Sequence, residues 1–325
     1  MSMLGDWKVP AAAQPQAKDY DYDLDAALRS VVALHALVPQ DAFTAEVLGT
    51  ERAGQGVLIR PSGIVLTIGY LIIEAESIWL RTGDDRVVPA HALAYDQETG
   101  FGLVQALAQL DLPAIPLGHS ADLSVGEYAV VGGAGGCEQS VAARVVARQE
   151  FAGYWEYVLD DAIFTAPAHP HWGGAPLLGP SGDLLGIGSL QLEQRRAGGL
   201  INHVNMMVPI DLLSPILDDL LQNGRANRPP RPWLGLYAAE IDDNVVIVGT
   251  VSGAPAEQAD LRQGDVVIAV AGAGVTSLAG LFRHIWLLGA AGVEVPMTLL
   301  RDNVVVEVTV TSGDRNRFLK APRLH

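Results

Sequence analysis

The stretch His169-Pro170-His171-Trp172-Gly173-Gly174-Ala175-Pro176-Leu177-Leu178 decides how this chain is interpreted. Its central residue, Gly173, has no side-chain oxygen and therefore cannot attack a carbonyl carbon as a nucleophile. On both sides of the stretch, short apolar runs alternate with turn residues, many of them glycine and proline. Such spacing is typical of a domain built from many short β-strands. The loop at Gly173 is therefore predicted to lie within a mostly β domain.

The composition is that of a folded, acidic protein. The chain has 325 residues, of which 49% are hydrophobic and 18% charged, and its formal net charge is −16. This length suits two domains, each with its own core. An acidic surface repels phosphate groups, so we expect neither nucleic acid nor an anionic membrane surface as a partner. The single cysteine, Cys137, cannot form an internal disulfide.

The sequence also bears on location. No apolar run reaches the roughly 18 residues that a membrane-spanning helix needs, and the first residues lack a basic segment followed by an apolar one. We therefore expect no membrane insertion and a cytoplasmic location. A periplasmic location is the alternative, if a signal peptide has been removed. No cofactor is expected.

Residues 30–222 are predicted to form a β-sandwich or β-barrels. The apolar runs that indicate strands are Val31–Leu37, Gly56–Ile59, Ile64–Thr67, Ser77–Arg81, Gly102–Ala106, Tyr128–Gly132, Ala142–Arg148, Tyr157–Leu159 and Leu184–Ser189. A helix is predicted from Val208 onward, because leucine and isoleucine recur at helical spacing over Leu212–Leu221. Asn223-Gly224 is predicted to end that helix.

Further segments flank this domain. Residues 1–29 are predicted to form an N-terminal tail or docking arm, in which Tyr20 and Tyr22 are candidate anchors for a neighbouring subunit. Residues 223–232 are rich in proline and are predicted to form a linker. Residues 233–313 are predicted to form a second domain with a helix near Ser277–Leu288. Residues 314–325 are predicted to form a tail.

Several segments, in order along the chain, resemble the HtrA-type serine proteases. Gly54–Ile59 with Pro61–Thr67 resembles the first hairpin of that family, and Asp96–Val104 resembles the strand that carries its catalytic aspartate. The loop at Gly173 resembles its nucleophile loop, and the second domain resembles a PDZ domain. The resemblance implies a mostly β fold, a chymotrypsin-like double β-barrel followed by a PDZ domain (α+β).

The resemblance also identifies the positions of the catalytic triad. Tyr70 stands where the family has its histidine, Gly100 where it has its aspartate, and Gly173 where it has its serine. A phenol, whose pKa is about 10, is a poor base at neutral pH, and glycine supplies neither a carboxylate nor a nucleophile. We therefore predict a pseudoprotease that is not an enzyme, although similarity alone would suggest a serine-type endopeptidase.

The loop before Gly173 raises two further points. His171 stands where the family has a glycine whose N–H helps to form the oxyanion hole, so that hole is expected to be altered. His169 and His171 are two residues apart, which in an extended loop places both rings on one side, as in half of a metal site. Packing of the two rings within the loop is the favoured interpretation, so no metal is predicted.

The second domain supplies the favoured binding site. PDZ domains add a peptide as an extra strand at a sheet edge, and backbone N–H groups of a loop hold the C-terminal carboxylate of that peptide. Leu234-Gly235-Leu236 matches the apolar-Gly-apolar carboxylate loop, and Leu281 and Ile285 give the following helix an apolar face. The expected partners are protein or peptide C-termini. A purely structural PDZ domain is the alternative.

Three functions are compatible with the sequence. The favoured one is a protein-binding scaffold or accessory subunit that acts through its PDZ and barrel surfaces. The first alternative is a chaperone-like or regulatory partner of an active HtrA-type protease, and the second is a serine endopeptidase with a displaced site. The resemblance also implies oligomerisation, as a trimer or within a larger complex.

Overall fold

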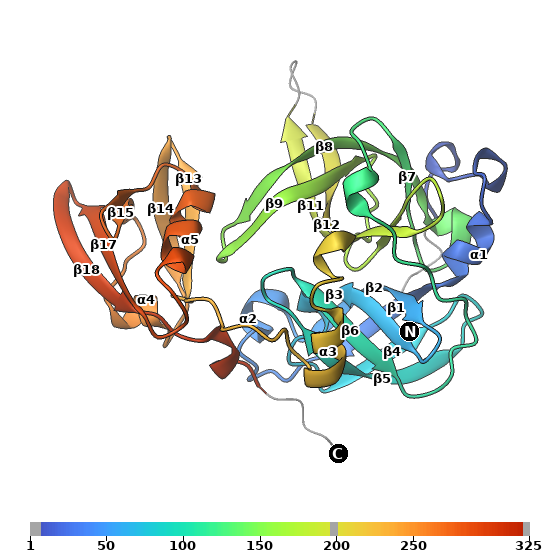
Figure 1. The fold of residues 1–325 in the computed structure, drawn as a ribbon, viewed down its shortest axis with the longest axis horizontal. Coiled ribbons are helices and arrows are strands. Elements are labelled where there is room, and N and C mark those ends of the chain that lie inside the picture. Colours follow the sequence, from blue (N-terminus) through green and yellow to red (C-terminus); the bar gives the residue numbers. More distant parts are fainter. Residues whose placement is uncertain (1–7, 196–200, 321–325) are drawn as a thin grey trace. The chain divides into compact units, whose positions relative to one another are not determined.

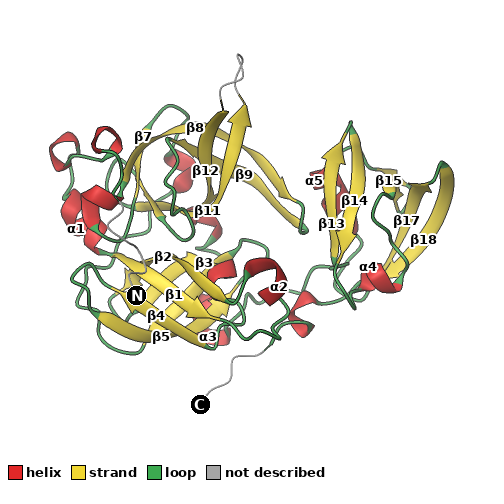
Figure 2. Ribbon diagram, turned by 180° about the vertical axis from the view of Figure 1, so that it is seen from behind, coloured by secondary structure: helices red, strands yellow, loops and turns green. Residues whose placement is uncertain are grey.

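The computed structural model describes residues 8–195 and 201–320, which form two compact units. The larger unit runs to Gln149 and also contains Asp161–Asn227 and Lys320; the smaller contains Glu150–Asp160 and Arg228–Leu319. Strands predominate in both units (Figure 2). Residues 1–7 and 321–325, at the ends of the predicted tails, lie outside the described residues.

Two closed six-stranded barrels form the larger unit (Figure 1). The first barrel has the strand order β1-β2-β3-β6-β5-β4, and the second has the order β10-β11-β12-β9-β8-β7. Their bounds are β1 Val31–Leu37, β2 Glu51–Arg60, β3 Ile64–Ile68, β4 Ser77–Arg81, β5 Val87–Tyr95, β6 Phe101–Ala106, β7 Tyr128–Val131, β8 Val141–Gly153, β9 Tyr157–Ala166, β10 Pro176–Leu178, β11 Leu184–Arg195 and β12 Ile201–Pro209. The predicted double barrel is confirmed.

Alternation of side chains explains how the short strands close around a core. In β4, Ile78 and Leu80 point inward and are buried, while Ser77, Trp79 and Arg81 between them are only partly buried. This is the two-residue period of a strand with one face packed. The predicted strand Ser77–Arg81 therefore has the bounds that the structure gives it.

Short helices connect and flank the barrels. They are η1 Ala11–Ala13, η2 Ala17–Asp19, α1 Leu24–Arg29, α2 Ala45–Leu48, η3 Gly69–Leu71, η4 Ser120–Asp122, η5 Gly136–Gln139, η6 Ile210–Leu212 and α3 Leu217–Asn223. None of the helices in residues 8–195 and 201–320 is long and apolar enough to cross a membrane.

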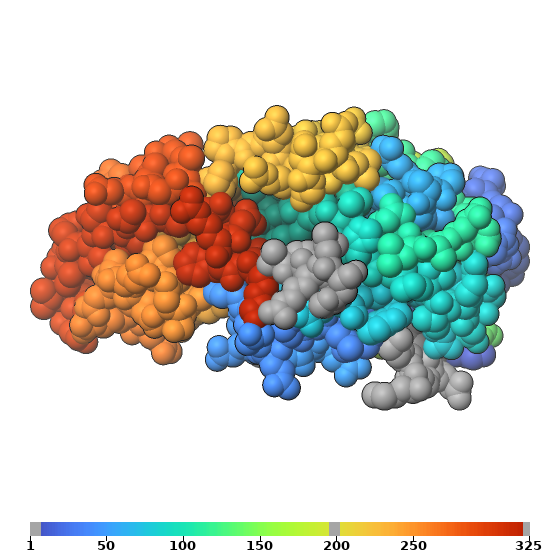
Figure 3. Space-filling model, turned by 90° about the horizontal axis from the view of Figure 1, so that it is seen from below, coloured from blue at the N-terminus to red at the C-terminus, as the bar shows by residue number. Residues whose placement is uncertain are grey.

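The helix predicted from Val208 is wrong in its first half. Val208 belongs to β12, the 3-10 helix η6 follows, and α3 begins only at Leu217. Pro215 explains the delay, because proline has no N–H to donate and the residue before it avoids the helical region. Gly224, with a φ of 71°, ends α3 as predicted. In Figure 3, α3 appears in gold at the surface beside the first barrel, where it contacts β5.

The N-terminal segment packs on the larger unit from Val9 onward. Val9 is buried in the core cluster of the second barrel. Asp23 begins α1 by accepting a hydrogen bond of 2.8 Å from the N–H of Ala26. The ring of Tyr22 lies so close to Gly182 that a Cβ added there would stand 2.5 Å from it. Tyr22 therefore has a packing partner within its own chain.

The smaller unit is a six-stranded sheet with two helices. Its strand order is β13-β14-β15-β17-β18, with β16 paired to β15, so β13 is an edge strand. The bounds are β13 Leu236–Ile241, β14 Asn244–Thr250, α4 Pro255–Gln258, β15 Val266–Val270, β16 Ala273–Gly274, α5 Leu278–Leu287, β17 Glu294–Arg301, β18 Val304–Thr311 and η7 Arg315–Arg317.

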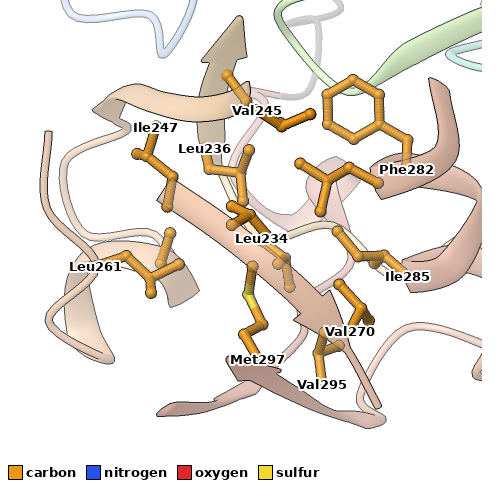
Figure 4. Close-up of a cluster of buried hydrophobic side chains, with 14 of the residues drawn as sticks. Leu234, Leu236, Val245, Ile247, Leu261, Val270, Phe282, Ile285, Val295 and Met297 are labelled. Carbon is orange, nitrogen blue, oxygen red and sulfur yellow. The ribbon is translucent and has the colours of Figure 1, made fainter. Parts of the chain in front are cut away.

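One hydrophobic cluster joins the helix and the sheet of this unit (Figure 4). Phe282 and Ile285 of α5 pack with Leu234, Leu236 and strand residues from β14, β15 and β17. Ser277 begins α5, because its side chain accepts a hydrogen bond of 3.0 Å from the N–H of Gly280. The helix predicted near Ser277–Leu288 is confirmed.

Candidate functional site

Tyr70 fills the space in front of Gly173. A Cβ built on Gly173 would lie 2.7 Å from the phenol oxygen of Tyr70. That oxygen donates a hydrogen bond of 3.0 Å to the carbonyl of Ser189 and accepts one from the side chain of Trp172. Burial raises the pKa of Tyr70, so the phenol is neutral at physiological pH. Tyr70 is therefore a buried structural group here, not an available base.

Gln55 fixes the backbone of the loop from several sides. Its N–H donates to the carbonyl of Gly173 at 2.8 Å, and its Nε2 donates to the carbonyl of His171 at 2.7 Å. Its Oε1 accepts a bond of 2.6 Å from the N–H of Ala134. The side chain is 1% exposed, so these bonds are shielded from water. The role of Gln55 was not predicted from the sequence.

His169 is a buried structural residue. Its Nε2 lies 2.7 Å from the carbonyl of Gln139, and its Nδ1 accepts a bond of 3.0 Å from the N–H of His171. These partners place the proton on Nε2. Burial lowers the pKa of His169 to about 4, so the ring is neutral at pH 7.

The two histidines therefore do not form half of a metal site in the described structure. The rings lie 6.3 Å apart, and both nitrogens of His169 are engaged. No group of three potential metal ligands occurs among the described residues. The resemblance assigns the N–H of His171 to the oxyanion hole. In this structure that N–H donates to Nδ1 of His169, so it is already engaged within the loop.

Gly100 lies in a tight turn at the start of β6. Its φ is 83°, a left-handed conformation that side chains other than glycine adopt with strain. Its carbonyl accepts a bond of 2.7 Å from the N–H of Gly69, close to Tyr70. Asp96 holds the same turn by accepting bonds from the N–H and hydroxyl of Thr99, at 2.9 and 2.8 Å. Asp96 is thus a turn residue.

Ser120 lies beside both a carboxylate and a histidine. Its hydroxyl donates to Oδ2 of Asp211 at 2.9 Å, and His119 lies 3.4 Å from the other oxygen of that carboxylate. Burial favours the neutral acid, but bonds from Ala121 and Ser120 hold the pKa of Asp211 below its usual range. The hydroxyl donates its hydrogen bond to the carboxylate and not to the imidazole, which differs from a nucleophile–histidine–carboxylate order.

The predicted carboxylate loop of the smaller unit holds a carboxylate. Glu156 Oε1 accepts bonds from the N–H groups of Gly235 at 2.7 Å, Leu236 at 3.1 Å and Leu234 at 3.2 Å. Its other oxygen lies 3.1 Å from the N–H of Leu234. Gly235 has a φ of 73°, which turns successive N–H groups toward one point. Glu156 is a functional candidate that the sequence did not reveal.

The other predicted groove residues are packed differently. Leu281 and Ile285 are both 0% exposed and belong to the core cluster of the unit. The side chains of Leu234 and Leu236 also point into that cluster (Figure 4). These four side chains therefore belong to the core of the unit, and the polar groups that the loop presents are its backbone N–H groups.

Two family models match the chain. The trypsin-like peptidase domain matches residues 54–187, and the PDZ domain matches residues 232–311. These ranges include Tyr70, Gly100, Gly173 and the carboxylate loop.

Curated relatives are named as serine endoproteases. The chain is 26% identical over 276 residues to a probable periplasmic serine endoprotease DegP-like of Chlamydia pneumoniae, covering 79% of this chain and 54% of the relative. A protein of the same name from Halomonas elongata is 28% identical, with 80% and 56% covered. The putative serine protease HhoA of Synechocystis sp. is 26% identical, with 80% and 70% covered. The chain thus spans little more than half the length of these DegP-like relatives.

A solved structure shares the fold. The HtrA-type protease AlgW with a decapeptide has a TM-score of 0.55 and 18% identity, covering 92% of this chain and 98% of that chain. A second AlgW structure, with a tripeptide, has a TM-score of 0.54. The arrangement of trypsin-like barrels followed by a PDZ domain is therefore confirmed.

Two predictions need correction. The prediction that the chain is not an enzyme is wrong by these comparisons, because the relatives are named serine endoproteases; residue types at three positions were given more weight than the kinship of the whole chain. The prediction of a cytoplasmic location is also wrong, because DegP-like relatives are named periplasmic. It relied on the first residues of the sequence, which do not settle where a protein acts.

Proposed function

This chain is homologous to the DegP/HtrA proteases, with a trypsin-like peptidase domain and a C-terminal PDZ domain, and from that premise we propose that it is a regulatory or chaperone-like partner of an active HtrA-type protease. It recognises polypeptide C-termini through its PDZ domain and acts in the periplasm, where the DegP-like relatives are named as working.

One observation carries this proposal. Three successive N–H groups, from Leu234 to Leu236, converge on a single carboxylate oxygen at 2.7–3.2 Å. Charge-assisted bonds of this kind are roughly twice as strong as bonds between neutral groups. The loop can therefore take the terminal carboxylate of another chain, and β13 beside it is an edge strand able to pair with a peptide backbone.

The barrel region supports a role beside a second protease. The proposal takes Tyr70, Gly100 and Gly173 as the counterparts of the family's triad positions. A phenol with a raised pKa faces a residue without a side chain there. In this arrangement the larger unit supplies a rigid protein surface to the active protease that it regulates.

The direct test is reconstitution with an active HtrA-type protease from the organism that encodes this chain. Casein cleavage by that protease is followed as the purified chain is added. We expect the cleavage rate to change and then to level off at a fixed ratio of the two proteins. A rate that stays constant, with no complex detected by analytical ultracentrifugation, would count against the proposal.

A second candidate is a serine endopeptidase whose nucleophile is not at position 173. The names of the relatives favour it, and Ser120 beside Asp211 is the first position to test. A fluorophosphonate probe that labels the native chain and loses its target in Ser120→Ala would support this candidate. Absence of labelling together with absence of casein cleavage by the chain alone would leave the regulatory role.

A further inference from the structure

The carboxylate loop of the smaller unit is already filled by the chain itself. Glu156 is 6% exposed and takes all three N–H groups of the loop. Its carboxylate stands for the C-terminal carboxylate that a PDZ loop receives from a peptide. Unlike a peptide C-terminus, Glu156 is followed by more chain. Its φ of 62° makes a turn that leads directly into β9, which begins at Tyr157.

The residues before Glu156 also occupy the place of a peptide. The carbonyl of Tyr154, two residues earlier, accepts a bond of 3.1 Å from the N–H of Ala238 on β13. This is the start of strand addition to the edge of the sheet. The ring of Tyr154 lies 5.7 Å from that of Tyr237 on the same strand. Backbone pairing and carboxylate binding therefore occur together, as they would for a bound C-terminus.

Ion pairs and packing hold the ends of the segment. Arg283 of α5 forms an ion pair of 2.5 Å with Glu150 and a second one with Asp160. Val158 is buried in the core cluster of the unit. The segment Glu150–Asp160 thus contacts the carboxylate loop, the edge strand and the groove helix at once.

We propose that the segment Tyr154–Glu156 is an internal ligand of the PDZ groove, which a polypeptide with a free C-terminal carboxylate must displace in order to bind. This inference rests on the proposed function, in that it assigns a regulation to the same groove. The loop has one set of convergent N–H groups, and two carboxylates cannot share them without like-charge repulsion. External binding and internal docking therefore exclude each other.

The test compares the full chain with two variants at position 156 and one control. Glu156→Ala removes the internal carboxylate, and Glu156→Gln keeps the shape of the side chain without its charge. Asp242→Asn is the matched control, because it removes one exposed acid from the turn after β13, at a φ of 48° that asparagine tolerates. The probe is a fluorescein-labelled pool of hexapeptides with free C-termini and an apolar last residue, beside the same pool with amidated C-termini.

We expect Glu156→Ala to bind the free-carboxylate pool at least about tenfold more tightly than the native chain, since loss of the hydrogen bonds that dock the side chain is worth that much or more. Glu156→Gln, an uncharged analogue of the docked acid, should keep the loop filled and bind no more tightly than the native chain. The control should bind as the native chain does, and the amidated pool should bind weakly throughout. Hydrogen exchange should be slow at the amides of Leu234, Gly235 and Leu236 in the native chain and in Glu156→Gln, and faster in Glu156→Ala.

The outcomes separate the two proposals. Equal peptide affinity of the native chain and Glu156→Ala, or unchanged exchange at the loop amides of that variant, overturns the internal ligand and leaves C-terminal recognition intact. Faster loop exchange in Glu156→Ala without any peptide binding supports the internal ligand and overturns C-terminal recognition.

Discussion

The phenol oxygen of Tyr70 lies 2.7 Å from the point where a Cβ would stand on Gly173. The two residues belong to different barrels, one following β3 and the other preceding β10. The large side chain of Tyr70, from the first barrel, thus faces Gly173, a residue without a side chain, from the second. A side chain added at position 173 would therefore crowd the phenol of Tyr70 unless a second change makes room.

We expect Gly173→Ser to lower the free energy of unfolding of the larger unit by about 1–3 kcal/mol, as overpacking usually does. The φ of Gly173 is not in the left-handed region, so contact rather than backbone strain is the cause. Tyr70→Phe removes the obstructing oxygen and leaves Cζ as the next atom, 3.6 Å away. The cost of Gly173→Ser should therefore fall below about 1 kcal/mol in the Tyr70→Phe background.

Urea unfolding of the four proteins in this cycle measures the coupling between the two positions. A coupling energy near zero would show that Tyr70 yields without cost, and that the observed contact does not constrain residue 173.

His169 should make the larger unit sensitive to acid. Burial lowers its pKa to about 4, below the value of about 6.5 in an unfolded chain. A histidine with a depressed pKa contributes stability that is complete above pH 6.5 and is lost as the pH falls to 4, by about 3 kcal/mol in all. In His169→Gln this part of the pH dependence should disappear, whatever the stability of the variant at pH 7.

Unfolding free energies measured at pH 7 and pH 4.5 test the assignment. His203→Gln is the control, because His203 is exposed. If His169→Gln and the native chain lose the same stability between these two pH values, another group carries the acid sensitivity.

Arg301 should be essential for the smaller unit. It donates two bonds of 2.7 Å to the carboxylate of Asp265, which is 1% exposed. Arg301→Leu leaves that buried carboxylate without its ion-pair partner and with the N–H of Arg262, at 2.8 Å, as its remaining donor, so we expect a loss of about 3 kcal/mol. Arg301→Lys keeps the charge without the two-pronged geometry and should cost less.

The exposed pair of Arg262 and Asp260 provides the comparison, since Arg262→Leu should change stability by less than about 1 kcal/mol. Thermal unfolding followed by differential scanning calorimetry reports the difference. Similar midpoints for Arg301→Leu and Arg262→Leu would refute the role given to the buried pair.

Docking of Glu156 should weaken as the pH rises. Burial raises the pKa of the docked carboxyl to about 7, against the opposing effect of the loop N–H groups and the positive charge of Arg315. An acid whose pKa is raised in the docked state favours docking most below its ordinary pKa of 4.5 and loses that contribution up to pH 7. External peptides, which stay ionised, should therefore bind the native chain more tightly at pH 8 than at pH 5.

Peptide titrations at both pH values, with Glu156→Gln beside the native chain, measure this effect. The variant should show a much smaller change in affinity. An equal change in both proteins would assign the pH dependence to a group other than Glu156.

Much of the fold could be predicted from the sequence, because strand signals are local. The bounds of β1 and β4 match the predicted runs Val31–Leu37 and Ser77–Arg81, since a two-residue alternation is read from neighbouring residues alone. The helix predicted from Val208 shows the limit of this approach. Its apolar spacing was periodic, but Pro215 prevented one continuous helix.

Candidate site residues could be predicted only where a short local motif identifies them. The family resemblance predicts triad positions at Tyr70, Gly100 and Gly173, and the apolar-Gly-apolar motif predicts the loop at Gly235. Glu156 was not predicted, because it lies 79 residues from Gly235 in the sequence and no local pattern connects a hairpin tip to a distant loop. The same holds for Gln55, which joins the loop at His171 from 116 residues away. Contacts of this range depend on how the strands assemble.

The central claim is that this chain modulates an active HtrA-type protease by recognising C-termini. The most direct measurement is the rate of casein cleavage by that protease with a saturating amount of the chain, in the presence of a free-carboxylate peptide or its amidated counterpart. The account predicts that the chain changes the rate, and that the free-carboxylate peptide alters this effect while the amidated peptide does not. A cleavage rate that is the same with and without the chain, under every peptide condition, would contradict it.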